Sequence, residues 1–350
     1  MDPEQQALEL IDRVRSKPPR FTDERITMAH GAGGKASRAL VEGLLAPVLG
    51  VRELGDAGAV GELALTTDSF VVKPLRFPGG SIGELAVNGT VNDLAMAGAK
   101  PLALTLSMIL EEGLDADTLR QEVDAIARAA EAASVAVVGG DTKVVERGAA
   151  DQMYLSTTGI GFVDARADLA PHNIKPGDQA IVSGPIGEHG TAIMLARGEF
   201  DLDAEIRSDT RSLWPVVDAL LEAAGAELHC LRDATRGGVA SVLNELARAS
   251  GTAMLIKEAD VPTTPIVQAA SELLGIDPMY VANEGKLVAF VAPQTADAAL
   301  AALHAIEGCD RAAVIGEVRE EPPAMVLVET SFGGKRVMDQ LVGDPLPRIC

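Results

Sequence analysis

The chain has 350 residues, 47% of them hydrophobic, and its formal charge at pH 7 is −21. This length and apolar content predict two folded domains with separate cores, and the excess of acidic residues disfavours binding to nucleic acid. The sequence contains no apolar stretch of membrane-spanning length and no signal-peptide pattern at the N-terminus, so we expect a cytoplasmic protein without membrane contact.

Strand-like and helical patterns alternate in the first half of the chain. The apolar runs predict strands over 63–72, 102–110, 135–140 and 153–163. A possible capping box of Ser81 and Glu84, with Gly98 as the end, predicts a helix over 81–98, and an apolar stripe predicts a second helix over 117–133. A polar stretch with prolines then precedes a new strand, and we place a domain boundary near residue 170.

The second half repeats this mixture of elements. We expect helices over 209–224, 236–250, 265–274 and 295–306. We expect strands over 180–183, 254–257, 286–292, 312–318 and 324–330. The chain is therefore predicted to be a mixed α/β protein with an N-terminal extension, two domains and a tail, over 1–24, 25–170, 171–340 and 341–350.

A glycine-rich run, HGAGGKAS, occupies residues 30–37. Its glycines Gly31, Gly33 and Gly34 would let backbone N–H groups approach phosphate oxygens, and Lys35 would add positive charge. The spacing matches neither a Walker A loop nor a dinucleotide fingerprint, so a mobile glycine loop is an equally good interpretation.

Five aspartates stand at the ends of predicted strands or in loops, among small or apolar neighbours: Asp56, Asp68, Asp93, Asp141 and Asp233. Carboxylate oxygens gathered in this way would suit Mg²⁺ bound to nucleotide phosphates, and we expect Asp56, Asp93 and Asp233 to be the metal ligands. For any one aspartate alone, a helix cap or turn is the simpler explanation.

Other polar residues lie beside these aspartates. Asn92 precedes Asp93 in a mostly apolar helical segment, and Thr142 follows Asp141. Arg236 and two glycines come directly before a predicted helix, which is a second plausible anion site. Lys143 and Glu284 are candidate proton carriers, although such residues at a strand end are usually solvated.

The chain ends in GDPLPRIC. Pro345 and Pro347 exclude a helix and predict an extended, flexible arm whose eight residues could reach about 25 Å, enough to bring the Cys350 thiol into a cleft. The alternative is a frayed terminus. The other cysteines, Cys230 and Cys309, form no C-x-x-C motif and suggest neither a disulfide framework nor a zinc site.

Taken together and in this order, the segments resemble the HypE family, the carbamoyl dehydratases of NiFe-hydrogenase maturation. The resemblance covers about 25–350 and rests on HGAGGKAS, TTDSFVVKPLRFPGGSIGELAVNGTVNDLAMAGAKP, GGDTKVVERG, RDATRGGVASVLNELA, ANEGKLV and the terminal PRIC. Selenophosphate synthetase and thiamine-phosphate kinase share the glycine and aspartate pattern but not the terminal PRIC. Ala32 stands where the family has serine, which puts a side-chain contact there in doubt.

The resemblance implies an AIR synthase-like fold in which N-terminal domains pair into a dimeric β-barrel, with ATP near the interface, and the C-terminal domain is an α/β sandwich. It further implies that a HypF-like carbamoyltransferase loads Cys350, that the protein dehydrates the resulting thiocarboxamide to a thiocyanate with ATP and Mg²⁺, and that the cyano group passes to iron on a HypC–HypD-like complex. Carried over by motif, Lys143 and Glu284 would move protons. Nucleotide contacts would come from the glycine run and from Lys35, Asp68, Asn92, Asp141, Thr142 and Arg236.

Two other functions stay open at this point. The protein could be an ATP-dependent phosphotransferase or synthetase acting on a free small molecule, in which case the tail takes no part in the chemistry. It could also be a non-enzymatic carrier, whose Cys350 holds a group that another protein transforms.

Overall fold

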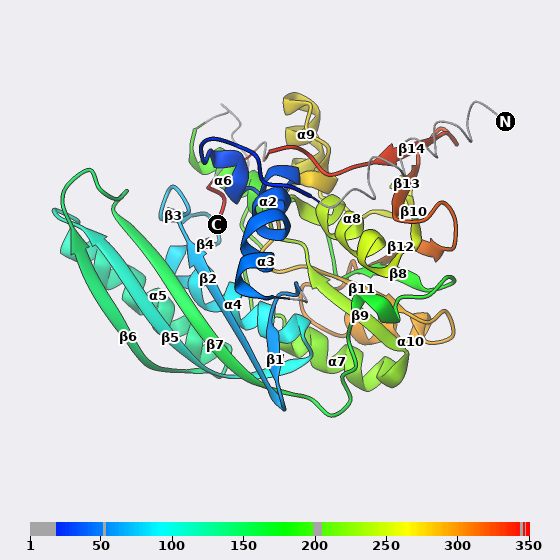
Figure 1. The fold of residues 1–350 in the computed structure, drawn as a ribbon, viewed down its shortest axis with the longest axis horizontal. Coiled ribbons are helices and arrows are strands. Elements are labelled where there is room, and N and C mark those ends of the chain that lie inside the picture. The colour runs from blue at the N-terminus through cyan, green and yellow to red at the C-terminus, as the bar shows by residue number, and fades with distance from the viewer. Residues whose placement is uncertain (1–18, 52–53, 199–204, 344–345, 347) are drawn as a thin grey trace.

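Two β-sheets of different size organise the protein, a computed structural model that describes residues 19–51, 54–198, 205–343, 346 and 348–350. The smaller sheet has the strand order β1-β2-β7-β5-β6, and the larger has the order β14-β13-β10-β12-β8-β11-β9. Figure 1 shows the two sheets side by side, with the smaller one on the left. The structure is therefore a mixed α/β fold, as the sequence predicted.

The smaller sheet is built from the first half of the described chain. Its strands are β1 (Gly58–Val60), β2 (Leu63–Phe70), β5 (Ala99–Glu111), β6 (Ala136–Val145) and β7 (Met153–Val163). Helices α4 (Ile82–Met96) and α5 (Ala116–Ala132) follow β2 and β5, and the short ribbon β3 (Arg76–Phe77) and β4 (Gly80–Ser81) precedes α4. The four predicted strands and both helices are confirmed, but β6 continues to Val145 instead of ending at residue 140.

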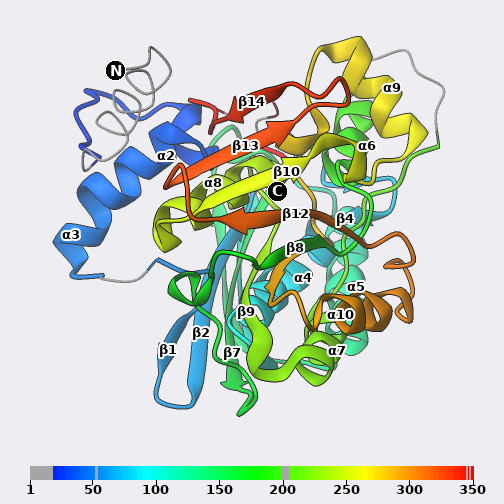
Figure 2. The ribbon, with the colours of Figure 1, turned by 90° about the vertical axis from the view of Figure 1, so that its right-hand side faces the viewer.

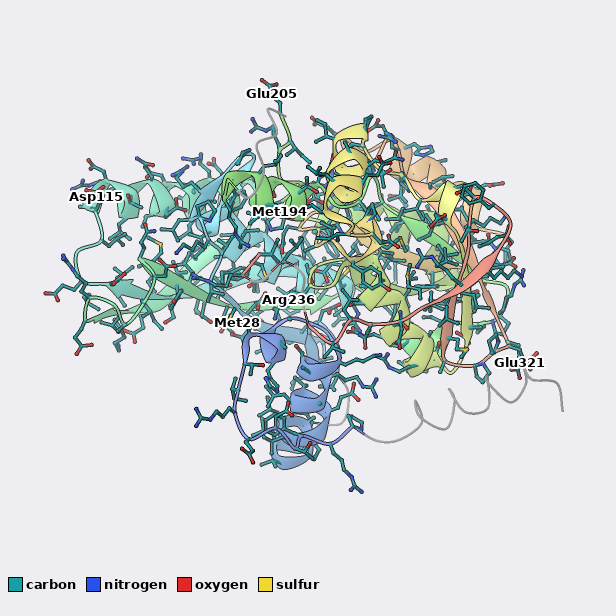
Figure 3. All side chains as sticks on the ribbon, turned by 90° about the horizontal axis from the view of Figure 1, so that it is seen from above. Met28, Asp115, Met194, Glu205, Arg236 and Glu321 are labelled. Atoms are coloured by element: carbon teal, nitrogen blue, oxygen red, sulfur yellow. The ribbon has the colours of Figure 1, made fainter. Side chains whose placement is uncertain are left out.

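One face of this sheet has no helix over it among the described residues. In β7 the odd-numbered residues are buried and the even-numbered ones are less so, because α4 packs against only one face. Leu65, Leu102, Ile109 and Phe162 are exposed on the other face. We call this uncovered surface the open face; Figure 3 shows Asp115, at the start of α5, on the opposite side of the sheet from Met28.

The larger sheet is covered on both faces. Its strands are β8 (Gln179–Val182), β9 (Leu228–Asp233), β10 (Ala253–Lys257), β11 (Leu287–Val291), β12 (Ala313–Arg319), β13 (Met325–Glu329) and β14 (Lys335–Met338). Helix α8 (Gly238–Ser250) packs on one face, and α7 (Trp214–Ala224) and α10 (Ala296–His304) pack on the other (Figure 2). Neighbouring residues of β11 accordingly face different cores, with Val288 against α8 and Leu287 against α7.

Most predicted elements of this half are confirmed within one or two residues, including α9 (Pro265–Leu274). The helix predicted from residue 209 begins only at Trp214, and residues 205–213 run as an irregular loop. The sequence patterns did not predict α6 (Glu188–Ala196), β9 or β14. The boundary near residue 170 stays a prediction; the strands of the two sheets lie on either side of it.

A short helical arm precedes the first sheet. It comprises a 3-10 turn (Met28–Gly31), α2 (Lys35–Leu40), a π turn (Val41–Leu45) and α3 (Ala46–Leu49). Throughout the part of the chain that the structure describes, no helix combines the length and the apolarity that crossing a membrane requires.

The described residues of the tail are packed against the rest of the protein. Leu346 and Ile349 are 4% and 2% exposed, and both belong to a core that also contains Ile193 and Val281. Within the described chain, 348–350 is neither helix nor strand, as the prolines predicted. The structure thus shows a docked tail, and its expected flexibility stays a prediction.

Candidate functional site

The three predicted metal ligands meet at the junction of the two sheets. Asp56 lies before β1, Asp93 is near the end of α4, and Asp233 is the last residue of β9. One carboxylate oxygen of each lies within 4.8 Å of the others. The Thr66 hydroxyl donates to Asp93 Oδ2 over 2.8 Å, and Arg232 Nη1 lies 2.5 Å from Asp56 Oδ1. We call Asp56, Asp93 and Asp233 the aspartate cluster.

Burial makes this concentration of negative charge unfavourable. Desolvation raises the pKa of Asp56, and it raises the pKa of Asp93 well above its usual value, with repulsion from Asp233 adding to the effect. For Asp233, burial and the charge of Asp56 raise the pKa to about 8. Carboxylate oxygens clustered in this way, with more negative than positive charge around them, fit a hard divalent cation such as Mg²⁺. Such a cation would relieve the repulsion between the carboxylates.

The aspartate cluster lines a cavity of about 290 Å³. Its other lining residues come from segments far apart in the sequence: Gly33, Gly55, Thr66, Thr67, Asp68, Gly89, Thr235, Arg236, Glu245, Glu284 and Cys350. The cavity therefore brings together the candidate metal site, the predicted proton carrier Glu284, the thiol of Cys350 and part of the glycine run.

Glu284 has an unusual environment in this cavity. It is 3% exposed, and its Oε1 has no hydrogen-bond partner in the described structure. Burial, followed by repulsion from Asp233, raises its pKa well above the usual value. Asp209 fixes the turn that carries it, because Asp209 Oδ1 accepts the backbone N–H of Glu284 over 3.0 Å. A buried, unpaired carboxyl group of this kind is suited to proton transfer.

Cys350 lies at the same cavity beside Arg236. Negative charge on Cys350 is the largest cause that raises the pKa of Arg236, and Arg236 Nη2 also lies 3.2 Å from Asp68 Oδ1. Both residues also line a neighbouring cavity of about 280 Å³. Figure 3 shows Arg236 near the centre of the molecule, a position from which its positive charge can neutralise anions at this junction.

The glycine run reaches the site, but its backbone is partly engaged. Gly33 and Gly31 line cavities around Arg236, and a Cβ on Gly33 would come within 2.8 Å of Arg236 Cβ. The N–H of Lys35 donates to the Leu341 carbonyl over 2.9 Å, so a Cβ on Gly34 would collide with that oxygen. The Lys35 side chain pairs with Asp339 at 2.7 Å. In this conformation the run binds the start of the tail.

Asn92 is buried in α4 and its amide is fully engaged. Its Oδ1 accepts the N–H of Leu213 over 2.7 Å, and its Nδ2 donates to the carbonyls of Arg211 and Glu284. These bonds explain why an amide occurs in an apolar helix, and they tie Asn92 to the turn of Glu284; its nucleotide contact stays a prediction.

Asp141, Thr142 and Lys143 lie away from the cavity, on the edge strand β6. Asp141 and Lys143 pair with each other, and the hydrogen bond from Lys143 lowers the pKa of Asp141. In register they lie opposite Ser107 and Ile109 of β5, which puts both on the open face. The single chain therefore assembles one part of the predicted site and leaves the other part uncovered.

Several arginines near the site were not predicted. An adjoining cavity of about 630 Å³ shares Gly33, Asp56 and Arg236 with the first one and is also lined by Arg38, Arg232 and Arg248. Arg232 is a strand residue, and its adjacency to Asp233 in RDATRGG was the signal available in the sequence. His189 and Arg197, which contact the tail, lie on the unpredicted helix α6 or at its end and carried no such signal.

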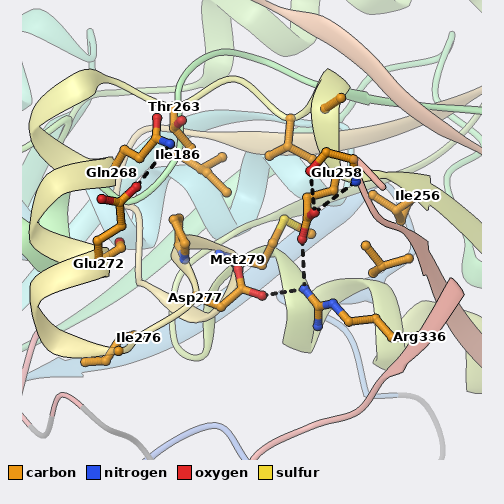
Figure 4. Close-up of a pocket in the computed structure, with 17 residues that line it drawn as sticks. Ile186, Ile256, Glu258, Thr263, Gln268, Glu272, Ile276, Asp277, Met279 and Arg336 are labelled. Carbon is orange, nitrogen blue, oxygen red and sulfur yellow. Dashed lines mark hydrogen bonds and ion pairs between the residues drawn. The ribbon is translucent and has the colours of Figure 1, made fainter. Parts of the chain in front are cut away.

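A separate groove of about 570 Å³ lies between α9 and the strands β10 and β13 (Figure 4). Arg336 crosses it and pairs with Asp277 at 2.6 Å and with Glu258 at 3.5 Å. None of the predicted site residues lines this groove.

Comparison with known proteins matches two parts of the chain to family models. Residues 54–163 match the family of AIR synthase related proteins, N-terminal domain, and residues 175–328 match the C-terminal domain of that family. A curated relative, the carbamoyl dehydratase HypE of Rhodobacter capsulatus, is 46% identical over 337 residues, which is 94% of this chain and 99% of the relative.

Solved structures are similar over most of the chain. A chain from the crystal structure of a HypE–HypF complex is 43% identical with a TM-score of 0.83, and the similarity covers 87% of this chain and all of that one. HypE in complex with ATP is 41% identical with a TM-score of 0.80, over 93% of this chain and all of the other. A thiamine monophosphate kinase from Aquifex aeolicus, at 20% identity and a TM-score of 0.64, shares the fold alone.

Proposed function

The chain belongs to the HypE family of carbamoyl dehydratases of hydrogenase maturation, and from this premise we propose that it converts an S-carbamoyl group on its own Cys350 into an S-cyano group with ATP. The observation that supports the proposal is the cavity in which Cys350 lies together with Glu284 and the aspartate cluster. A thiol, a buried proton carrier and a cation site in one cavity are the parts that an ATP-driven dehydration needs.

The reaction must remove an amide oxygen, which is a poor leaving group. Transfer of the γ-phosphoryl group of ATP to that oxygen turns it into phosphate, and departure of phosphate with loss of both N–H protons leaves the nitrile. The products are therefore S-cyano-cysteine, ADP, hydrogen phosphate and one proton. Arg236, beside Cys350, would hold negative charge that develops near the reacting sulfur and phosphoryl group.

The two protons require two acceptors. Glu284 is the first candidate, because it lines the cavity that holds Cys350 and its buried Oε1 has no hydrogen-bond partner in the described structure. Lys143 is the second, carried over from the family motif. It would act from the other subunit of a dimer, since its own chain keeps it on the open face and outside the cavity.

The aspartate cluster would hold Mg²⁺, whose chemistry when bound is to neutralise phosphate charge during phosphoryl transfer. ATP binding is supported by the similarity to HypE in complex with ATP. We assign nucleotide contacts to Gly31, Gly33, Gly34 and Lys35 of the glycine run, and to Asp68 and Arg236, with Asp141 and Thr142 from the second subunit.

A homodimer is supported by the open face itself. The uncovered sheet face exposes the apolar side chains of Leu65, Leu102, Ile109 and Phe162, and exposed apolar patches often mark a protein interface. Pairing two such faces would bury these side chains and form the barrel that the family resemblance implies. It would also give Asp141 and Lys143 a partner surface to face.

The proposed partners follow from the chemistry of the two steps on either side. A HypF-like carbamoyltransferase would load Cys350, as the similarity to a chain of a HypE–HypF complex supports. A HypC–HypD-like complex would accept the cyano group on iron. None of the three cysteines is in a disulfide, and Cys350 must be a thiol to be loaded, which supports a reducing location such as the cytoplasm.

The decisive experiment uses the full chain carbamoylated on Cys350 and mixed with Mg²⁺ and ATP. The proposal expects the protein to lose the mass of one water and the peptide with Cys350 to carry the cyano group. A phosphorylated free ligand with an unchanged tail would favour a phosphotransferase. An unchanged carbamoyl group would favour a carrier. Modification mapped to Cys230 or Cys309 would overturn the assignment of the acceptor.

A further inference from the structure

The end of the tail is held by a set of polar contacts outside the reaction cavity. His189 Nε2 lies 2.8 Å from the Ile349 carbonyl oxygen, and Arg197 Nη2 donates to the Arg348 carbonyl over 2.6 Å. The backbone N–H of Val71 donates to an oxygen of the Cys350 α-carboxylate over 3.1 Å. These contacts fix the backbone on both sides of the last peptide bond, and so they determine where the thiol of Cys350 lies.

His189 is the buried member of this set. It is completely buried, and the desolvation lowers its pKa, so its imidazole is neutral near pH 7. A carbonyl oxygen only accepts hydrogen bonds, so Nε2 must carry the proton and Nδ1 must accept one. The Ser208 hydroxyl donates this hydrogen bond to Nδ1 over 2.8 Å, and the Phe77 ring packs edge-on against the imidazole. The tautomer that binds the tail is therefore selected by Ser208.

The same segment that orients His189 also positions Glu284. Asp209 follows Ser208, and its carboxylate accepts the backbone N–H groups of Glu284 and Gly285 over 3.0 and 3.3 Å. Lys286 Nζ, 3.1 Å from Asp209, holds that carboxylate in place. One short loop thus contacts both the residue that binds the tail and the turn that carries the proton acceptor.

We propose that His189 is a positioning residue for the dehydration step, which latches the docked tail through the Ile349 carbonyl and aligns Cys350 with Glu284 through the 208–209 segment. The proposal rests on the function proposed above, in which Cys350 is the carrier. It assigns His189 to dehydration and not to loading, because a thiol that lies in the cavity must leave it to meet the carbamoyltransferase. Loss of the latch should therefore affect the two steps in different directions.

The test compares His189→Phe with His189→Gln in both steps. Phenylalanine keeps the aromatic packing but leaves the Ile349 carbonyl without its donor, whereas the amide nitrogen of glutamine can occupy the position of Nε2. In single-turnover dehydration of the pre-carbamoylated protein at saturating ATP, we expect His189→Phe to be slower by about tenfold, since one lost buried hydrogen bond shifts docking by that order. Carbamoylation and alkylation of Cys350 should be as fast as in the wild type or faster, and His189→Gln should recover most of the dehydration rate.

A matched control is His304→Phe, which removes another imidazole-to-carbonyl bond, to Ala312, remote from the tail. It should leave both steps unchanged. If His189→Phe does not fold, Arg197→Ala is the deciding variant, because Arg197 is only partly buried and its loss should give the same slow dehydration with fast loading. Dehydration by a folded His189→Phe or Arg197→Ala at the wild-type rate would overturn the latch, and cyanation at a residue other than Cys350 would instead overturn the function on which it rests.

Discussion

The aspartate cavity and the edge strand β6 carry the same kinds of residue but hold them in opposite ways. Around the cavity, burial raises the pKa values of Asp93, Asp233 and Glu284. On β6, Asp141 is exposed and paired with Lys143, and its pKa is lowered. The buried carboxyl groups of the cavity favour binding of a cation or a proton. The carboxylate of Asp141 on β6 is already paired with the positive charge of Lys143.

Under the proposed function, this difference would leave a single chain with an incomplete site. The cavity has a thiol, a buried acid and a cluster of metal ligands, but the second proton carrier of the family motif lies on the open face. If another subunit buried the open face, the Asp141–Lys143 pair would no longer be exposed to solvent and would lie against the site of that subunit. Both regions would then be buried. Three predictions test the comparison, beginning with the largest expected effect.

Replacement of Glu284 by glutamine should reduce dehydration by about 10²- to 10⁴-fold, the usual contribution of a general acid or base. Glutamine has the same shape and cannot accept the proton. Because burial already disfavours the charged form of Glu284, the melting temperature should be unchanged or higher. The measurements are single-turnover cyanation and thermal unfolding of the same preparation. ATP binding like that of the wild type serves as the control, and cyanation within a few-fold of the wild-type rate would remove Glu284 from the mechanism.

Mixing two inactive variants should restore activity if β6 serves the neighbouring subunit. Lys143→Met removes the charge on the open face, and Glu284→Gln disables the cavity. After dissociation and random reassociation, a mixed dimer holds one site with both intact residues, so about one site in four should cyanate its tail. The readout is the cyanated fraction by intact mass. No recovery in mixtures that form dimers would show that Lys143 acts within its own chain, and equal activity of Lys143→Met alone would show that it does not act at all.

The smallest effect concerns pH and Mg²⁺. The folded pKa of Asp233, about 8, lies above its unfolded value near 4, so the folded state retains a proton that the unfolded chain releases between these values. Stability of the metal-free protein should therefore fall as pH rises towards 8, with a slope of at most about 1.4 kcal/mol per pH unit for one proton. Mg²⁺ should raise the melting temperature more at pH 8 than at pH 7, since the cation competes with that proton.

Asp233→Asn is the matched variant for this measurement, because the amide cannot release a proton. Its melting temperature should depend less on pH in this range and should respond less to Mg²⁺. A wild type whose melting temperature rises from pH 7 to 8 and ignores Mg²⁺ would mean that the aspartate cluster is a structural network and not a cation site.

Local patterns in the sequence predicted much of the fold. Hydrophobic patterns located β2, β7, α5 and α9, because burial leaves a regular trace along the chain. Helix α4 is buried almost all round and was located by the residues at its two ends. The same patterns missed α6, which is buried almost all round and so has no polar face to mark its period. They also predicted too early a start for α7, because residues 209–213 are held in a loop by contacts with Asn92 and the Glu284 turn, which lie far away in the sequence.

What the sequence by itself determined is the inventory of chemistry: the acidic residues, the glycine run, the two proton carriers and the terminal thiol, all of which are properties of residue type and order. Only the tertiary structure decided which of them meet. Asp56, Asp93 and Asp233 converge because a loop, a helix end and a strand end lie at one junction, whereas Lys143 stays outside because β6 is an edge strand. The position of the docked tail depends on His189 and Val71, which are far from the tail in the sequence and close to it only in the folded chain. Burial and charge repulsion, which set the pKa of each carboxyl group, likewise exist only once the chain has folded.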